Sequence, residues 1–168
     1  VRRLELLPTE VLSLLTAGAI LGKEFNPKEA RDLAGSDESP VRKALIEATS
    51  RNIIWIDEKS GRALFVHDKL RESLLARLDP QTKKQLHLRA AIMLETADER
   101  LPFEISYHYD SAGDSERARP FALQAASSAR AKHSLSIAIQ QSQIALRGTS
   151  PSEPAIFRSI QEGLSDVY

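Results

Sequence analysis

Cysteine is absent from this chain of 168 residues, so disulfide bonds and thiolate metal sites are excluded. An excess of either charge is also lacking, because 23 Lys and Arg residues balance 23 Asp and Glu residues. A dedicated nucleic-acid-binding protein usually carries a basic excess, so the charge argues against that class and leaves only a local basic patch open. No apolar run reaches the ~18 residues of a membrane-spanning helix, so no membrane partner is expected.

The residues that are present are typical of a globular protein. Hydrophobic residues make up 42% of the chain and charged residues 27%, which is a composition that supports a packed core. The chain begins at Val1 instead of Met, and no basic-then-apolar signal segment follows. We therefore expect a fragment of a larger cytoplasmic protein with further domains on either side.

The first half of the sequence changes from helical to strand periodicity in a defined order. Three stretches have apolar residues at helical spacing, and each begins near a proline or a capping residue. The expected helix starts are Pro8, Asn26-Pro27 and Ser39-Pro40, and the expected ends of the first two helices are Gly22 and Gly35. Two β-branched and aromatic runs, 53–56 and 63–66, follow and are joined by a turn with a glycine, which predicts a hairpin. Helix, helix, helix, hairpin is the order of a winged helix, so we expect residues 1–78 to form one.

The second half has helical spacing only. Asp79-Pro80 predicts the start of a connecting helix over 79–101, and Leu101-Pro102 predicts its end. Small residues then recur at four-residue spacing, which lets neighbouring helices approach closely; they are Ala118, Ala122 and Ala125, followed by Ala138, Ser142 and Ala145. Gly113-Asp114 is the expected turn between paired helices, and Ile156, Ile160 and Leu164 indicate a last helix. Residues 102–168 are therefore predicted to form a truncated array of α-α helical repeats.

Several stretches resemble a known family. Residues 4–25, 65–78 and 86–94 resemble the winged-helix region that follows the ATPase module in signal-transduction ATPases with numerous domains, the STAND ATPases. Relatives include bacterial kinase–ATPase fusions, maltose-regulator-type transcription activators, apoptotic protease-activating factors and plant disease-resistance proteins. Residues 102–146 resemble the tetratricopeptide-like (TPR-like) repeats of the bacterial members. The resemblance implies a mostly α fold, a winged helix followed by a TPR-like array.

The resemblance also implies a nucleotide-sensing role for two residues. Val66-His67-Asp68 is similar to the family's Met-His-Asp motif, in which the histidine contacts the phosphates of bound ADP. His67 is the implied sensor, and Asp68 is expected to cap a helix that starts near Lys69. Val66 departs from the Met of the motif but keeps an apolar side chain. The implied cofactor is ADP or ATP with Mg²⁺, held by an upstream nucleotide-binding module of the same protein, with no cofactor in this chain alone.

DNA binding is the alternative function. The third predicted helix would be the DNA-reading helix of a winged helix, and it carries Arg42, Lys43 and Arg51 as candidate contacts. Glu38 and Glu47 offset these charges, and the charges of the wing turn sum to zero. A DNA-reading surface normally shows more unopposed cations, so DNA contact through this segment is not favoured.

No constellation in the sequence predicts catalysis or metal binding. Gly18 and Gly22 are followed by Lys23, but a phosphate-binding loop needs one more residue between its glycines and a Ser or Thr where Glu24 stands. His87, His108 and His133 fall on separate predicted helices without a third ligand at metal-site spacing, and we interpret them as packing or solvated side chains. We therefore predict a non-catalytic regulatory segment that couples the nucleotide state of the upstream module to an unknown protein or peptide bound by the helical repeats.

Overall fold

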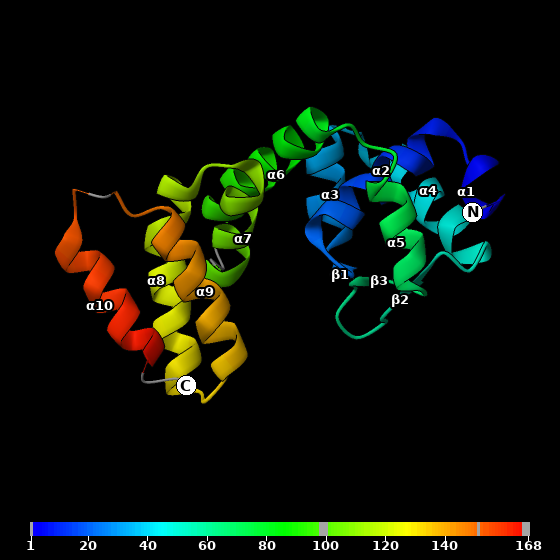
Figure 1. Cartoon of the computed structure of the whole chain (residues 1–168). Coiled ribbons are helices and arrows are strands. Elements are labelled where there is room, and N and C mark those ends of the chain that lie inside the picture. Colours follow the sequence, from blue (N-terminus) through cyan, green and yellow to red (C-terminus); the bar gives the residue numbers. More distant parts are fainter. Residues whose placement is uncertain (1, 98–100, 151, 166–168) are drawn as a thin grey trace. The chain divides into compact units, whose positions relative to one another are not determined.

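The structure is a computed structural model that describes residues 2–97, 101–150 and 152–165 (Figure 1). It is mostly α-helical with one small antiparallel sheet, which confirms the predicted class. The chain forms two compact units, Val1–Leu86 and His87–Tyr168. The expected division at residues 78 and 101 stays a prediction.

The first unit combines five complete helices, the beginning of a sixth and three short strands in its described part. The helices are α1 (Arg2–Glu5), α2 (Thr9–Leu21), α3 (Pro27–Ala34), α4 (Glu38–Ser50) and α5 (Asp68–Leu75), and the strands are β1 (Glu24–Phe25), β2 (Ile54–Ile56) and β3 (Ala63–Phe65). The sheet has the order β1-β3-β2, and both pairings are antiparallel. The hairpin β2–β3 confirms the prediction from the two apolar runs.

Local capping bonds explain where α3 begins and ends. The Asn26 side chain accepts a hydrogen bond from the backbone N–H of Lys28 at 2.9 Å, and Pro27 is the first helical residue, where its missing N–H costs nothing. Gly35 ends the helix with a left-handed backbone, φ 67°, which glycine adopts without steric cost. Both predicted boundaries are therefore confirmed.

Two other helix boundaries differ from the predictions. The helix α4 begins at Glu38 rather than at Ser39-Pro40, because Asp37 takes the extended backbone of the capping position. The proline is still tolerated there, since the first four N–H groups of a helix have no intrahelical partner. The helix α6 (Pro80–Glu95) ends at Glu95, before the predicted end at Leu101-Pro102.

Strand β1 is an element that the sequence patterns did not predict. It pairs with β3, with Glu24 opposite Leu64 and Phe25 opposite Ala63. The Phe25 ring is almost fully buried, and its centroid lies 5.4 Å from that of Phe65. The contact between the Phe25 and Phe65 rings therefore holds β1 in the core, next to α2.

The second unit contains helices only, among its described residues. They are the later part of α6 (Pro80–Glu95), in which the boundary between the units falls, followed by α7 (Pro102–Ala112), α8 (Ser115–Ala131), α9 (Leu135–Arg147) and α10 (Pro154–Ser165). The helix α8 packs along both α7 and α9, and α10 packs on α9. Both groups of small residues are buried, as predicted from their spacing: Ala118, Ala122, Ala125, Ala138, Ser142 and Ala145.

Turns and caps of the second unit also follow the sequence. Gly113 ends α7 with a left-handed backbone, φ 86°, and Asp114 caps α8 by accepting from the backbone N–H of Arg117 at 3.2 Å. The helix α7 begins at Pro102, as expected. Ile160 is buried on α10, whereas the side chains of Ile156 and Leu164 lie outside the described residues.

Candidate functional site

His67 lies at the junction between β3 and α5. The carbonyl of His67 accepts from the backbone N–H of Leu70 at 3.0 Å, and the N–H of the preceding Val66 donates to the carbonyl of Ile53 at 3.0 Å. The His67 side chain is exposed, and its imidazole forms no hydrogen bond with any residue that the structure describes. The fold therefore fixes the backbone at this point and leaves the side chain exposed.

Asp68 does not cap α5, so that expectation is wrong. The helix begins at Asp68 itself, and His67 occupies the capping position with an extended backbone, φ −135° and ψ 134°. A capping side chain belongs to the residue before the first helical one, so the Asp68 carboxylate is misplaced for that role. It lies beside Lys23 instead, with Lys23 Nζ 3.0 Å from Asp68 Oδ1.

Lys23 is the residue of this region that the sequence patterns missed. It is 45 residues from Asp68 along the chain, and no local motif signals the contact. The Lys23 carbonyl accepts from the N–H of Phe65 at 3.0 Å, so the pairing of β1 with β3 brings Lys23 to the junction. The Arg71 side chain also anchors α5 at this end of α2, since its Nε donates to the carbonyl of Ala19 at 2.8 Å. We call Lys23, His67 and Asp68 the junction site.

The glycine pair before Lys23 has a structural role. Gly18 lies inside α2, and Gly22 is the residue that ends this helix, with its N–H donating to the carbonyl of Gly18 at 3.0 Å. A phosphate-binding loop presents the start of a helix to its ligand, and this segment presents a helix end.

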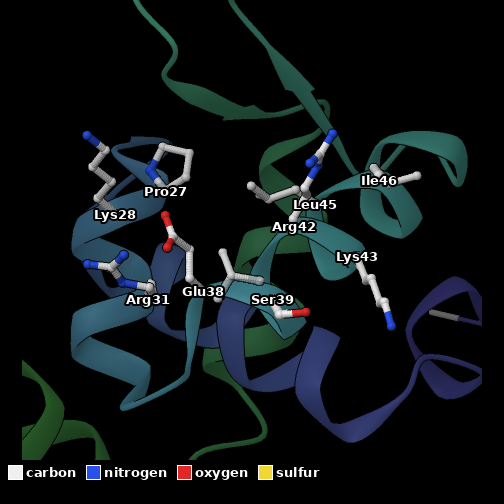
Figure 2. Close-up of a pocket in the computed structure, with 10 residues that line it drawn as sticks. Pro27, Lys28, Arg31, Glu38, Ser39, Arg42, Lys43, Leu45 and Ile46 are labelled. Atoms are coloured by element: carbon white, nitrogen blue, oxygen red, sulfur yellow. The ribbon is translucent and has the colours of Figure 1, made fainter.

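The three candidate DNA contacts fall into two groups. Arg42 and Lys43 are exposed on α4, and their side chains leave the helix in different directions (Figure 2). Arg51 follows the end of α4 and pairs with Glu47, with Nε 2.6 Å from Oε1. Arg51 is therefore compensated within the chain, and DNA contact by Arg42 and Lys43 stays a prediction.

Two of the three remaining histidines meet inside the second unit. His87 and His108 are 3% and 1% exposed, and their Nδ1 atoms are 2.9 Å apart. The sequence predicted packing or solvated side chains for the three histidines. His87 and His108 are packing side chains, and His133 is exposed. Within residues 2–97, 101–150 and 152–165 no group of three His, Cys, Asp or Glu side chains is placed to hold a metal ion.

A hollow of about 590 Å³ lies on the second unit beside Tyr109. The Tyr109 hydroxyl donates to the Glu95 carboxylate, and the Arg117 guanidinium lies 5.1 Å from the Tyr109 ring centroid. Burial of Tyr109, together with the Glu95 bond and its negative charge, raises the pKa of the phenol to about 12. The phenol therefore stays protonated well above neutral pH, and its hydrogen bond links α7 to Glu95 at the end of α6.

Comparison with protein families, curated proteins and solved structures finds no match for this chain. None of the described helices combines the length and the hydrophobicity that crossing a bilayer requires.

Proposed function

We propose that this chain is a non-catalytic regulatory segment of a multidomain signalling ATPase of the STAND kind. In this proposal the first unit is a winged helix that closes on an upstream nucleotide-binding module. The order of elements supports it: α2, α3 and α4 precede the β2–β3 hairpin, and α5 follows the hairpin directly. The additional strand β1, between α2 and α3, joins the hairpin in one sheet.

The observation that carries the proposal is that the His67 side chain is exposed on a fixed backbone. Its imidazole is exposed and without a hydrogen bond to any described residue, while β3 and α5 hold its backbone on both sides. An imidazole N–H donates well to a phosphate oxygen, and a charge-assisted bond of this kind is among the stronger ones. His67 is therefore the group that contacts the phosphates of ADP when the upstream module holds the nucleotide.

The charge balance of the junction site explains why a second module is needed. Lys23 supplies a cation next to the His67 position, but Asp68 pairs with it, and both side chains are more than half exposed. A solvent-exposed and already compensated cation gives little affinity for an anion. This chain alone therefore binds nucleotide weakly, and the upstream module supplies most of the site together with Mg²⁺.

The second unit acts as the sensor of a partner in this proposal. Helices α7, α8 and α9 pack in succession with small residues between them, which supports a TPR-like array. The hollow beside Tyr109 is the surface that takes a protein or peptide ligand. Nucleotide at His67 and a partner on α7–α9 then bias one equilibrium between a closed and an open form, provided that each binds the two forms with different affinity.

The test is the nucleotide content of this protein expressed together with its upstream region, measured by extraction and chromatography. We expect stoichiometric ADP in the longer protein and none in the present chain. His67→Ala in the longer protein should weaken ADP binding at least about tenfold, because a hydrogen bond to a charged group contributes roughly 1.5–3 kcal/mol. His133→Asn is the matched control, since His133 is exposed in the second unit with φ 56° and asparagine tolerates that backbone. Unchanged ADP affinity in His67→Ala would refute the sensor role.

A further inference from the structure

A second surface of the first unit has the features of a recognition groove. It is an open groove of about 870 Å³ between α3 and α4. In Figure 2, Lys28 and Arg31 lie on the α3 side, Arg42 and Ile46 lie on the α4 side, and Glu38 lies between them. The groove is separate from the junction site, because no residue of that site lines it.

Apolar side chains from both helices form part of the lining of the groove. Pro27 contributes from α3, and Val41, Leu45 and Ile46 contribute from α4. Ile46 is 63% exposed, and the neighbouring Leu45 is half-buried. Exposed apolar surface with a polar rim marks an interaction site more often than an ordinary solvated face.

The rim of the groove carries a positive surplus. Lys28, Arg42 and Lys43 form no ion pair with any described residue, whereas Arg31 pairs with Asp32, with Nη2 2.7 Å from Oδ1. Glu38 is the one carboxylate among the residues that line the groove. Lys28 and Arg42 lie on opposite sides of Glu38, and Lys43 adds a third cation at the edge of the groove, with its side chain directed away from α3 (Figure 2). The lining residues therefore carry a positive surplus, so the complementary ligand is negatively charged.

The apolar part of the lining distinguishes between two kinds of negative ligand. A nucleic acid would pair its phosphates with the rim cations but would leave Ile46 and Leu45 against a hydrated backbone. A protein segment with a bulky apolar side chain covers them and places Asp or Glu beside the cations, which gives an apolar centre with a charged rim. The lining of the groove therefore favours a protein ligand.

We infer that the α3–α4 groove binds an acidic segment of a partner protein. One or two large apolar side chains of that segment cover Ile46 and Leu45, and acidic residues on either side pair with Lys28, Arg42 and Lys43. The site is independent of nucleotide sensing at His67, so its presence or absence leaves the proposed function untouched.

The experiment is a selection from a random library of displayed 12-residue peptides against the whole chain, with Arg42→Glu/Lys43→Glu as the counter-target. Both positions are exposed, so the double variant should keep the fold, which far-UV circular dichroism checks. We expect the enriched peptides to share a net negative charge and at least one Leu, Ile, Phe or Trp. An enriched peptide labelled for fluorescence anisotropy should bind the charge-reversed variant at least about tenfold more weakly, since reversal replaces two attractions by two repulsions.

Two matched variants separate the groove from general surface charge. Ile46→Ser keeps the charges and should weaken the same peptide about fivefold or more, because it removes exposed apolar contact area. Lys59→Glu/Lys84→Glu makes the same charge change at exposed positions outside the groove and should leave the affinity within about twofold.

Three results would overturn the inference. One is a selection that enriches nothing, and another is enriched peptides without an acidic bias or with equal affinity for the charge-reversed variant. The third is tight binding of a 20-base-pair DNA duplex that Arg42→Glu/Lys43→Glu abolishes while no peptide binds, which would assign the groove to nucleic acid.

Discussion

The contact between Gly18 and Phe25 gives the sharpest quantitative prediction for the first unit. A Cβ at Gly18 would lie 2.6 Å from Cζ of the Phe25 ring, whereas ordinary contact begins at 3.4 Å, so the ring would have to retreat by about 0.8 Å. The ring is 1% exposed and packs on Phe65, so it has no open space to move into. Gly18→Ala therefore places an extra carbon in a filled core.

Two opposing effects set the magnitude. Replacing glycine by alanine inside a helix stabilises it by about 1 kcal/mol, because the unfolded chain loses less conformational freedom. Overpacking a filled core costs about 1–3 kcal/mol. We expect the steric cost to win and Gly18→Ala to lower the free energy of unfolding by up to about 2 kcal/mol.

The assay uses the one tryptophan of the chain, Trp55, which lies on β2 in the first unit. Urea unfolding followed by Trp55 fluorescence reports the first unit, and far-UV circular dichroism reports both units, which need not unfold in one transition. Gly18→Ala should lower the fluorescence midpoint. In Gly18→Ala/Phe25→Leu the loss should be smaller than the sum of the two single losses, because the shorter side chain makes room for the new methyl group. A stabilised Gly18→Ala protein would refute the packing argument.

Two further predictions concern the second unit. Gly148→Ala should destabilise it by about 3 kcal/mol or more, because the new Cβ would lie 2.0 Å from the carbonyl oxygen of Ser115, a backbone atom that cannot move aside; the circular dichroism transition should shift while the tryptophan transition does not. Tyr109 has its pKa raised from 10.0 to about 12, so the folded state favours the neutral phenol, and stability is unaffected below pH 10 and falls as the pH rises from 10 to 12. Tyr109→Phe should reduce the fall in the free energy of unfolding between pH 9 and pH 12 by about 1–2 kcal/mol, which urea titrations at the two pH values measure. If the free energy falls equally in the wild-type and Tyr109→Phe proteins, the raised pKa is wrong.

Boundaries that depend on local chemistry were predictable from the sequence. The Asn26-Pro27 start of α3, the Gly35 end of α3 and the Gly113-Asp114 turn each rest on bonds within a few residues. The same holds for the start of α6, where the Asp79 carboxylate accepts from the N–H of Thr82 at 2.9 Å. The α4 start was misplaced because Asp37 and Ser39 are both good capping residues, and the sequence does not decide between them.

Contacts that join distant segments were not predictable in the same way. Strand β1 is only two residues long, too short for an alternating pattern, and its existence depends on pairing with β3. Lys23 meets Asp68 only through that pairing, and His87 meets His108 across two helices. The candidate site was therefore predicted as His67 and Asp68, and the cation that pairs with Asp68 required the fold.

The same pairing decides whether the junction site depends on the core. Phe25 belongs to β1, and the carbonyl of Lys23 binds the N–H of Phe65, so a ring displaced by Gly18→Ala should move β1 and change the surroundings of Lys23 and Asp68. Amide chemical shifts in the ¹H–¹⁵N spectrum should then change at residues 23 and 66–68, and Phe25→Leu in the same chain should partly restore them. If these shifts stay constant while the stability falls, α5 holds the junction site by its own contacts, and β1 contributes stability alone.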